Sequence, residues 1–215
     1  MPLPSDVSPS DDGHRRRYDT ASLLDVAVQV FTERGYDGTS MGDLAHASGL
    51  SKSSLYHHFD SKEQLLRAAL DRAVEPLFAV VAEPAAQSGR AIDRLEHVVR
   101  REVQVLVEQL PSVTLLLRVH GNTPTERWAL ERRREFDRIV ADLVAQAAAE
   151  GDVRTDVQAG LVTRLLFGMI NSLVEWYRPD EAGSGEARRG TSSRTVGADE
   201  LADAVVRLAF DGLRR

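Results

Sequence analysis

The chain has 215 residues, of which 42% are hydrophobic and 28% charged, and it contains no cysteine. This length fits one or two domains, and the apolar fraction is too high for a chain that is disordered throughout. No apolar run reaches the roughly 18 residues of a membrane span, and residues 1–13 lack the apolar core of a secretory signal peptide. We therefore expect a soluble cytoplasmic protein without membrane contact. The absence of cysteine excludes disulfides and thiolate metal sites, and no cofactor is expected.

Apolar residues recur at spacings of three and four, whereas the alternation typical of strands is not sustained anywhere. The sequence therefore predicts an all-α protein. In chain order we expect helices over 20–34, from a cap at Ser40 to about Ala47, from a cap at Ser51 to about His58, and from a cap at Ser61 to about Val81. Further helices are expected over 91–110, 112–120, 125–150, 155–177 and 198–213.

Two segments fall outside this periodicity. Residues 1–17 are rich in Pro, Ser and Asp and end in the basic run His14–Arg17. We expect a flexible arm that adds contacts to DNA phosphates or the minor groove, and a solvated tail is the alternative. Residues 181–197 are rich in Gly, Ser, Thr and Arg, which predicts a flexible loop between the last two helices.

The stretch from Thr39 to Phe59 has the spacing of a helix-turn-helix, with a short helix, a turn at Gly49 and a second short helix. Apolar residues would hold the two helices together, namely Met41, Leu44, Ala45, Leu50, Leu55 and Phe59. Polar side chains point elsewhere on the second helix, namely Lys52, Ser53, Ser54, Tyr56, His57 and His58. Such side chains suit contacts with base edges and phosphates. Because His57 and His58 point about 100° apart, no metal site is expected.

The run from Leu23 to Leu70 resembles the N-terminal DNA-binding domain of TetR-type bacterial transcriptional regulators, through the strings FTERGYDGTS, GLSKSSLYHHF and SKEQLL. The resemblance implies a helix-turn-helix domain over 18–65 and a helical effector-binding and dimerisation domain over 66–215. It also implies DNA contacts by Thr39, Ser40, Ser51, Lys52, Ser53, Ser54, Tyr56, His57 and Lys62. Among these we expect Tyr56 and Lys62 to anchor phosphates.

Charge alone gives no support to DNA binding, since the net charge is −6 and the N-terminal domain is close to neutral. Binding must then come from the local placement of a few cations and helix ends. The only two lysines, Lys52 and Lys62, bracket the predicted recognition segment. A helical interaction protein that has lost DNA binding is therefore kept as an alternative.

The helix predicted over 155–177 is apolar on more than one side, which indicates burial on several sides, and the helix predicted over 198–213 is also strongly apolar. In TetR-type proteins the last two helices pair with their symmetry mates. We therefore expect a homodimer that binds a palindromic double-stranded operator. A monomer that buries these faces in its own core is the alternative.

Polar residues within this apolar setting are the candidates for effector binding. Arg132 lies between Trp128 and Phe136 at helical spacing, and the strings from Arg118 to Asp137 and from Glu175 to Asp180 resemble an actinobacterial branch of the family. That branch often responds to acyl-CoA thioesters, whose phosphates and adenine suit Arg and Trp. The expected contacts are Arg118, Trp128, Arg132, Arg164, Phe167, Asn171 and Trp176. Ordinary structural ion pairs are the alternative for the arginines.

These expectations describe a ligand-responsive DNA-binding regulator, usually a repressor in this family. An all-α enzyme acting on a thioester-like ligand is the rival reading, but no catalytic signature such as GxSxG, HExxH or a P-loop is present. The sequence does not give the operator, the effector, the regulated genes or the direction of regulation.

Overall fold

The computed structural model describes residues 20–179 and 196–214. Regular structure in these ranges is helical, apart from an isolated β-bridge between Val153 and Arg214. The helices are α1 (Thr20–Arg34), α2 (Met41–Ala47), α3 (Lys52–His58), α4 (Lys62–Ala82), α5 (Pro84–Gln87), α6 (Ala91–Glu108), α7 (Leu110–Arg118), α8 (Pro124–Ala149), α9 (Ala159–Asn171), α10 (Leu173–Trp176) and α11 (Ala198–Leu213). The predicted all-α fold is confirmed. The arm over 1–17 and most of the loop over 181–197 lie outside the described residues.

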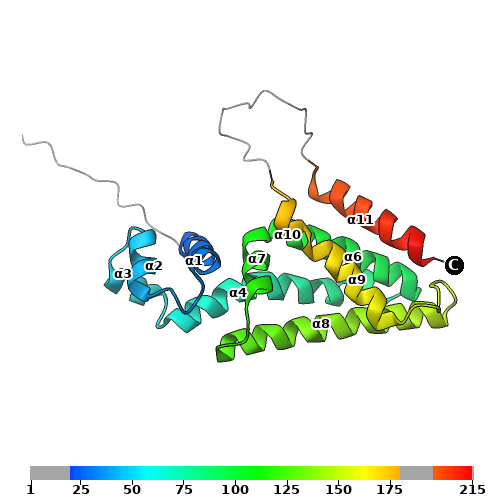
Figure 1. Cartoon of the computed structure of the whole chain (residues 1–215), viewed down its shortest axis with the longest axis horizontal. Helices are drawn as coiled ribbons and strands as arrows, with labels where there is room; N and C mark the ends of the chain where they lie inside the picture. Colours follow the sequence, from blue (N-terminus) through cyan, green and yellow to red (C-terminus); the bar gives the residue numbers. More distant parts are fainter. Residues whose placement is uncertain (1–19, 180–195, 215) are drawn as a thin grey trace, which may run out of the picture.

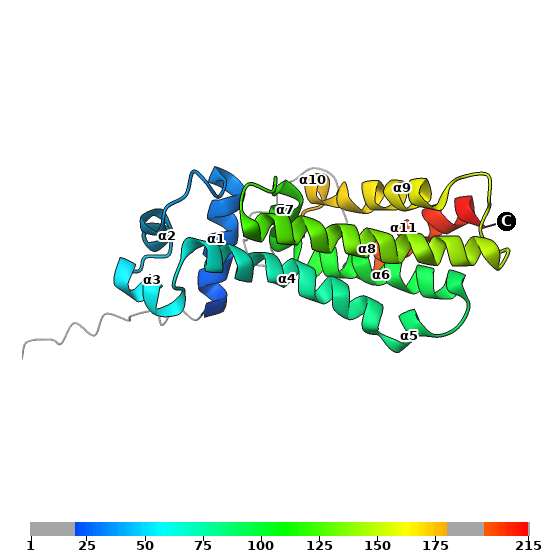
Figure 2. The ribbon, with the colours of Figure 1, turned by 90° about the horizontal axis from the view of Figure 1, so that it is seen from below.

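The helices form a small unit at one end of an elongated molecule and a larger bundle beside it (Figures 1 and 2). The small unit contains α1, α2 and α3, and the bundle contains α5 to α11. The long helix α4 contacts α1 at one end and α6, α7 and α8 along the rest of its length. It passes without a break through the domain boundary placed at residues 65 and 66. That boundary therefore stays a prediction.

Local hydrogen bonds explain why the small unit folds as the sequence predicts. Ser40 and Asp43 form a capping box at the start of α2, and the Ser51 hydroxyl accepts from the backbone N–H of Ser54 at the start of α3. The turn between them passes through Gly49, whose φ of +66° is a conformation that L side chains rarely adopt. Leu55 is fully buried and ties α3 to the rest of the unit.

Proline and serine account for the helix ends that the sequence placed incorrectly. Pro111 lies in the first turn of α7, so the break between α6 and α7 falls at Gln109, two residues before the predicted one. The single helix predicted over 155–177 is wrong, because α9 begins only at Ala159 and a separate α10 follows Ser172. The hydroxyl of Ser172 donates to the Met169 carbonyl at 2.7 Å, a local bond that competes with helical hydrogen bonding.

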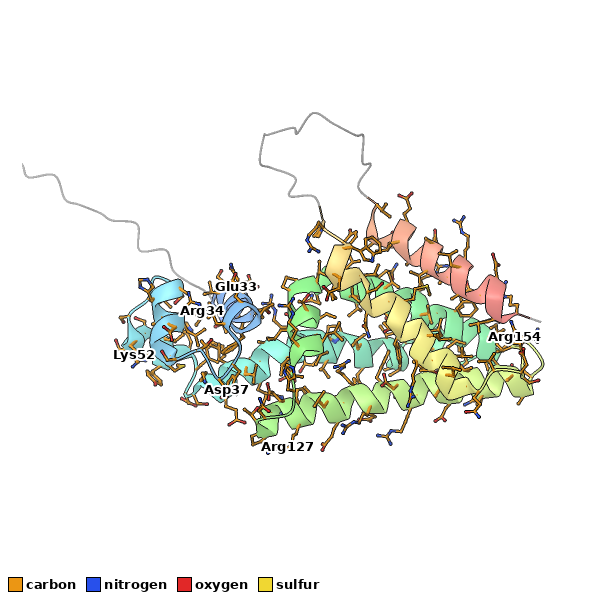
Figure 3. All side chains as sticks on the ribbon, viewed as in Figure 1. Glu33, Arg34, Asp37, Lys52, Arg127 and Arg154 are labelled. Atoms are coloured by element: carbon orange, nitrogen blue, oxygen red, sulfur yellow. The ribbon has the colours of Figure 1, made fainter. Side chains whose placement is uncertain are left out.

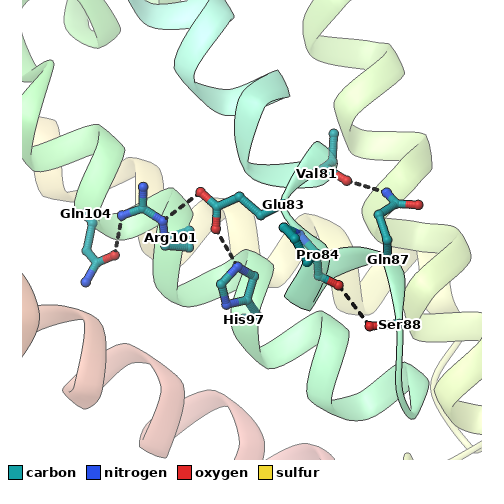
Figure 4. A network of polar contacts seen from close by, with 8 residues as sticks. All are labelled: Val81, Glu83, Pro84, Gln87, Ser88, His97, Arg101 and Gln104. Carbon is teal, nitrogen blue, oxygen red and sulfur yellow. Dashed lines mark hydrogen bonds and ion pairs between the residues drawn. The ribbon is translucent and has the colours of Figure 1, made fainter.

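A polar network fixes the bend that follows α4 (Figure 4). Glu83 joins α4 to α6, because it accepts from His97 at 2.7 Å and from Arg101 at 3.2 Å. Burial alone would raise the pKa of Glu83, but these two hydrogen bonds lower it below its ordinary value. Pro84 at the first position of α5 starts a one-turn helix that the sequence analysis did not predict.

Candidate DNA-binding surface and effector pocket

The polar face of α3 lies at the tip of the small unit, on the side away from the bundle. Figure 3 shows Lys52 at this end of the molecule. Lys52, Ser53 and His57 are exposed, and Tyr56 has 47% of its surface exposed. Leu55, on the opposite face of the helix, is fully buried. The structure therefore presents hydrogen-bonding side chains of α3 to solvent from a helix that its apolar side holds in place.

The candidate serines are exposed or half-buried and already take part in local hydrogen bonds. The Ser51 hydroxyl lies 3.0 Å from that of Ser53 and 2.9 Å from that of Ser54. Ser40 donates to Asp43 through both its backbone N–H and its hydroxyl. Hydroxyl groups keep a second lone pair and can rotate, so these serines remain able to bind a further partner.

Thr39 is placed differently from the other candidates. Only 2% of its surface is exposed, its hydroxyl donates to the Gly35 carbonyl at 2.7 Å, and its backbone N–H donates to Tyr36. The side chain therefore closes the turn between α1 and α2, and the expected DNA contact by this side chain does not fit its buried position.

Lys62 is also occupied within the protein. Its ammonium donates to the carbonyls of Tyr36 and Thr39, each at 2.8 Å, and lies 3.9 Å from the centre of the Tyr36 ring. Two of its three N–H donors are thereby used. This arrangement makes Lys62 a positioning residue, since it holds the α1–α2 turn against the start of α4.

A partly open cavity of about 50 Å³ lies between α4, α6, α7, α8 and α9. Much of the wall is aromatic, because the rings of Phe78 and Phe167 lie 6.0 and 5.9 Å from that of Phe136. The full lining is Val74, Leu77, Phe78, Glu102, Val113, Leu116, Leu117, Arg132, Arg133, Phe136, Asp137, Phe167 and Asn171. An apolar chamber with a few convergent polar groups is the usual form of a small-molecule site.

The ionisable residues of this cavity differ in depth. Glu102 is only 6% exposed, whereas Asp137 is an exposed residue. Burial, and secondarily the charge of Asp137, raises the pKa of Glu102 well above its ordinary value. Burial also lowers the pKa of Arg133 and raises that of Asp137. Sequence analysis missed Glu102, Arg133 and Asp137.

The residues expected to bind effector do not all lie together. Arg132, Phe167 and Asn171 line the cavity, and the Arg132 guanidinium stacks 3.5 Å from the centre of the Phe78 ring. Trp128 is instead covered by Arg67, at 3.4 Å from its ring centre. Arg164 and Trp176 are exposed and lie outside this cavity.

Arg118 lines a second hollow, a groove of about 630 Å³ between α1 and the bundle. Arg72 and Arg178 are its other basic residues. Helix α7 separates the groove from the cavity, because Leu110, Thr114 and Arg118 face the groove whereas Val113 and Leu116 face the cavity. Arg118 also donates to the Thr32 carbonyl of α1 at 3.2 Å. A displacement of α7 would therefore alter this contact with α1.

The outer sides of α9 and α11 carry exposed leucines. Leu161 and Leu165 on α9 are 50% and 63% exposed, and Leu208 on α11 is 74% exposed. The inner side of α11 is held to α6 by Leu201, Val205 and Phe210 and by an ion pair between Arg100 and Asp203. For α9 the prediction of apolar residues on more than one side is confirmed.

Two kinds of site find no support among residues 20–179 and 196–214. No group of three or more His, Asp or Glu side chains there is arranged to hold a metal ion. Within the same ranges no helix combines the length and the apolarity that a membrane span requires.

Comparisons with known proteins place the chain in a family. A solved structure of SCO3833, a member of the TetR transcriptional regulator family from Streptomyces coelicolor A3, is 61% identical, with a TM-score of 0.79. The match covers 90% of this chain and 91% of that one. The chain belongs to the TetR family. The model of bacterial regulatory proteins of the tetR family matches residues 23–69, and that of tetracyclin repressor-like C-terminal domains matches residues 88–188.

This TetR-family chain is also similar to more distant relatives. The HTH-type transcriptional repressor KstR2 of Rhodococcus jostii is 29% identical over 208 residues, covering 95% of this chain and 96% of the relative. The structure of AibR in complex with isovaleryl coenzyme A and operator DNA has a TM-score of 0.68 at 24% identity and covers 88% of this chain and 97% of that one. The second likeness shows the fold alone. Because the family consists of transcriptional regulators, the chain is a DNA-binding regulator and the enzyme reading is wrong.

Proposed function

We propose that this TetR-family regulator is a homodimeric repressor that binds a palindromic operator and leaves it when a small effector binds in the larger bundle. The observation that supports this most is the exposed polar face of α3, held at the tip of the small unit by a buried Leu55. A helix with such a face suits entry into the major groove, where the side chains of its first turns reach base edges. The protein would act in the cytoplasm, where the operator DNA is.

The exposed leucines of α9 and α11 support dimerisation through these two helices. Large apolar side chains on a continuous outer face mark surfaces that bind a partner. A second copy related by a two-fold axis would cover Leu161, Leu165 and Leu208 with the same residues. Two recognition helices would then face the same side of the DNA, about one turn apart.

An acyl-CoA thioester is the effector class that we propose. Its acyl group would enter the cavity, and its phosphates would lie on the arginines of the groove or of the cavity rim. One solved structure supports this class: AibR, with the same fold, was crystallised with isovaleryl coenzyme A and operator DNA. Arg118, Arg132, Phe167 and Asn171 are retained as proposed contacts.

Helix α7 is the element that would transmit effector binding. It forms a wall of both hollows and contacts α1 of the small unit. An acyl chain larger than the present cavity must displace a wall, and a shift of α7 would carry the Arg118 contact on Thr32 with it. The effector would thereby favour a conformation in which the two α3 helices no longer match successive major grooves.

The test is a gel shift with the DNA upstream of the protein's own gene, in the presence of free CoA or of saturated acyl-CoAs from four to sixteen carbons. We expect specific binding without ligand and release by at least one acyl-CoA but not by free CoA. In Arg118→Ala the acyl-CoA concentration for half release should rise about tenfold, whereas Arg154→Ala, at the far end of the bundle, should behave as wild type. Failure to bind the upstream DNA would contradict repression of the protein's own gene, which this test assumes. Binding that no acyl-CoA relieves would contradict the effector class.

A further inference from the structure

Glu102 is the one ionisable side chain of the described ranges that is almost completely buried and also has a carboxylate oxygen without a hydrogen-bond partner there. The orphan atom is Oε2, and the residue is 6% exposed. Thr32 and Asp152 also have a buried oxygen of this kind in the described part of the chain. Asp152 differs because its other oxygen pairs with Arg90, and Thr32 carries no charge. Of these three residues in the described ranges, Glu102 alone also lines the cavity of the bundle.

Such an arrangement is unfavourable in a protein that only has to fold. A buried polar atom without a partner loses its hydration and gains nothing in return. The neighbours of Glu102 on the buried side of α6 are valines and leucines, for example Val98, Val99, Val105 and Leu106, all at most 2% exposed. An apolar residue would therefore suit the position better. The carboxyl group at this place points to a ligand.

The cavity determines which ligand group can reach Glu102. Apart from Glu102, its polar lining residues are Arg132, Arg133 and Asp137 of α8 and Asn171 of α9, and the rest of the lining is apolar. A volume of about 50 Å³ holds one or two water molecules, so an effector group must widen the cavity as it enters. An effector would therefore place an apolar group inside, and only an atom of that group could approach Oε2.

We propose that Glu102 is the polar recognition group of the effector pocket and donates a hydrogen bond to an uncharged oxygen, a carbonyl or hydroxyl, on the apolar part of the effector. This inference rests on the proposed effector response. A carboxyl group donates only in its protonated form, which burial favours here. A cationic ligand fits less well, because two of the three charged residues on α8 that line the cavity are arginines, and the remaining one, Asp137, is already near Arg133.

Three small ring compounds of nearly equal shape test this on the full-length protein. Cyclopentanone offers an oxygen acceptor, methylenecyclopentane replaces that oxygen by a CH₂ group, and cyclopentylamine is cationic at neutral pH. Their dissociation constants would be measured by saturation-transfer NMR for wild type, Glu102→Gln and Glu102→Met. The ratio of the dissociation constants of the ketone and the hydrocarbon cancels the general preference of the cavity for apolar molecules, as in a double-mutant cycle.

We expect Glu102→Met to shift the ratio at least tenfold toward the hydrocarbon, whereas Glu102→Gln, which keeps a neutral N–H donor, should stay within about threefold of wild type. The inference would be overturned by an unchanged ratio in the methionine variant. It would also be overturned if the amine bound best to wild type and lost tenfold or more in Glu102→Gln, since that result means an ionised carboxylate. Folding of each variant is checked by its retained affinity for operator DNA. These probes are measured without DNA, so the inference about Glu102 can fail while release from DNA by acyl-CoAs still holds. Likewise, release by acyl-CoAs can fail while the inference about Glu102 holds.

Discussion

The polar side chains at the two ends of this regulator differ in whether the protein itself satisfies their hydrogen bonds. At the tip, the serines of α2 and α3 cap helices and bond to neighbours in the chain, so the DNA-facing surface is complete before DNA arrives. In the bundle, Glu102 is buried with an oxygen that has no partner in the described residues. Under our proposals, the first surface is formed before DNA binds, whereas the second is completed by a bound group. Separate substitutions should therefore affect one end without the other.

The largest effect is expected where the two copies meet. Leu165→Arg places a charge on a face that we propose to be buried between subunits, so the dimer should dissociate at micromolar concentration and operator affinity should fall more than 100-fold. Analytical ultracentrifugation and fluorescence anisotropy measure the two effects. Ala145→Arg, which adds the same charge to an exposed position of α8, is the control. A stable Leu165→Arg dimer with normal DNA affinity would disprove this interface.

The next effect concerns the link between the small unit and α4. Lys62→Met removes two hydrogen bonds from a charged donor, at a cost of about 1.5–3 kcal/mol. The Thr39 carbonyl loses this donor, whereas the Tyr36 carbonyl still accepts from the backbone N–H of Thr39. Operator affinity should fall about tenfold while the slope of log affinity against log salt is unchanged, because Lys62 positions rather than contacts phosphate. A slope reduced by about one would show instead that Lys62 binds a phosphate directly.

Substitution of Glu102 should change the thermal stability of the fold. Glu102→Met removes a buried unsatisfied group and should stabilise the fold by about 1–3 kcal/mol at pH 7, a gain in Tm of several degrees. For Glu102→Gln the gain should depend on pH. The raised pKa means that folded wild type keeps its proton where the unfolded chain has lost it, so wild-type stability falls as the pH rises above about 4.5.

The difference in Tm between Glu102→Gln and wild type should therefore be small near pH 4.5 and should widen up to the pKa of the folded carboxyl. The charged groups that line the same cavity, Asp137, Arg132 and Arg133, are present in both proteins and largely cancel in the difference. Calorimetry from pH 4.5 to 8 measures it. A difference that narrows as the pH rises would contradict the burial of a protonated Glu102.

The smallest effect is expected at a single exposed cation. Lys52→Ala should lower operator affinity a few-fold and reduce the salt slope by about one, without changing the preferred sequence. Arg154→Ala at the opposite end of the molecule controls for the loss of one positive charge (Figure 3). An unchanged slope for Lys52→Ala would remove Lys52 from the phosphate contacts.

The sequence predicted the features that depend on contacts between residues close in the chain, and missed those that depend on distant residues. The caps at Ser40, Ser51 and Ser61 bond to residues three positions away, so their motifs are visible in the sequence and the helix starts were correct. The contacts of Lys62 span 26 and 23 residues, and no local pattern indicates them. The expectation that Lys62 binds a phosphate, which rested on the resemblance, could not take these internal hydrogen bonds into account.

The cavity shows the same limit. Arg132 was noticed because aromatic residues flank it on its own helix, but the ring that it stacks on, Phe78, belongs to α4. Trp128 lay on the same predicted stripe, yet Arg67 of α4 covers it. Glu102 could have been found, since it interrupts a stripe of Leu95, Val98, Val99, Val105 and Leu106 at helical spacing. The sequence shows that interruption but not the absence of a partner.

The central claim is that α3 of two symmetric subunits lies in the major groove of the operator, and affinity cleavage tests it most directly. The chain lacks cysteine, so Ser53→Cys offers a single attachment point for an iron–EDTA group on α3. We predict two clusters of DNA cleavage related by a two-fold axis and about 34 Å apart, and none from the same reagent on Ala145→Cys. A single cluster, or equal cleavage from both positions, would contradict the account.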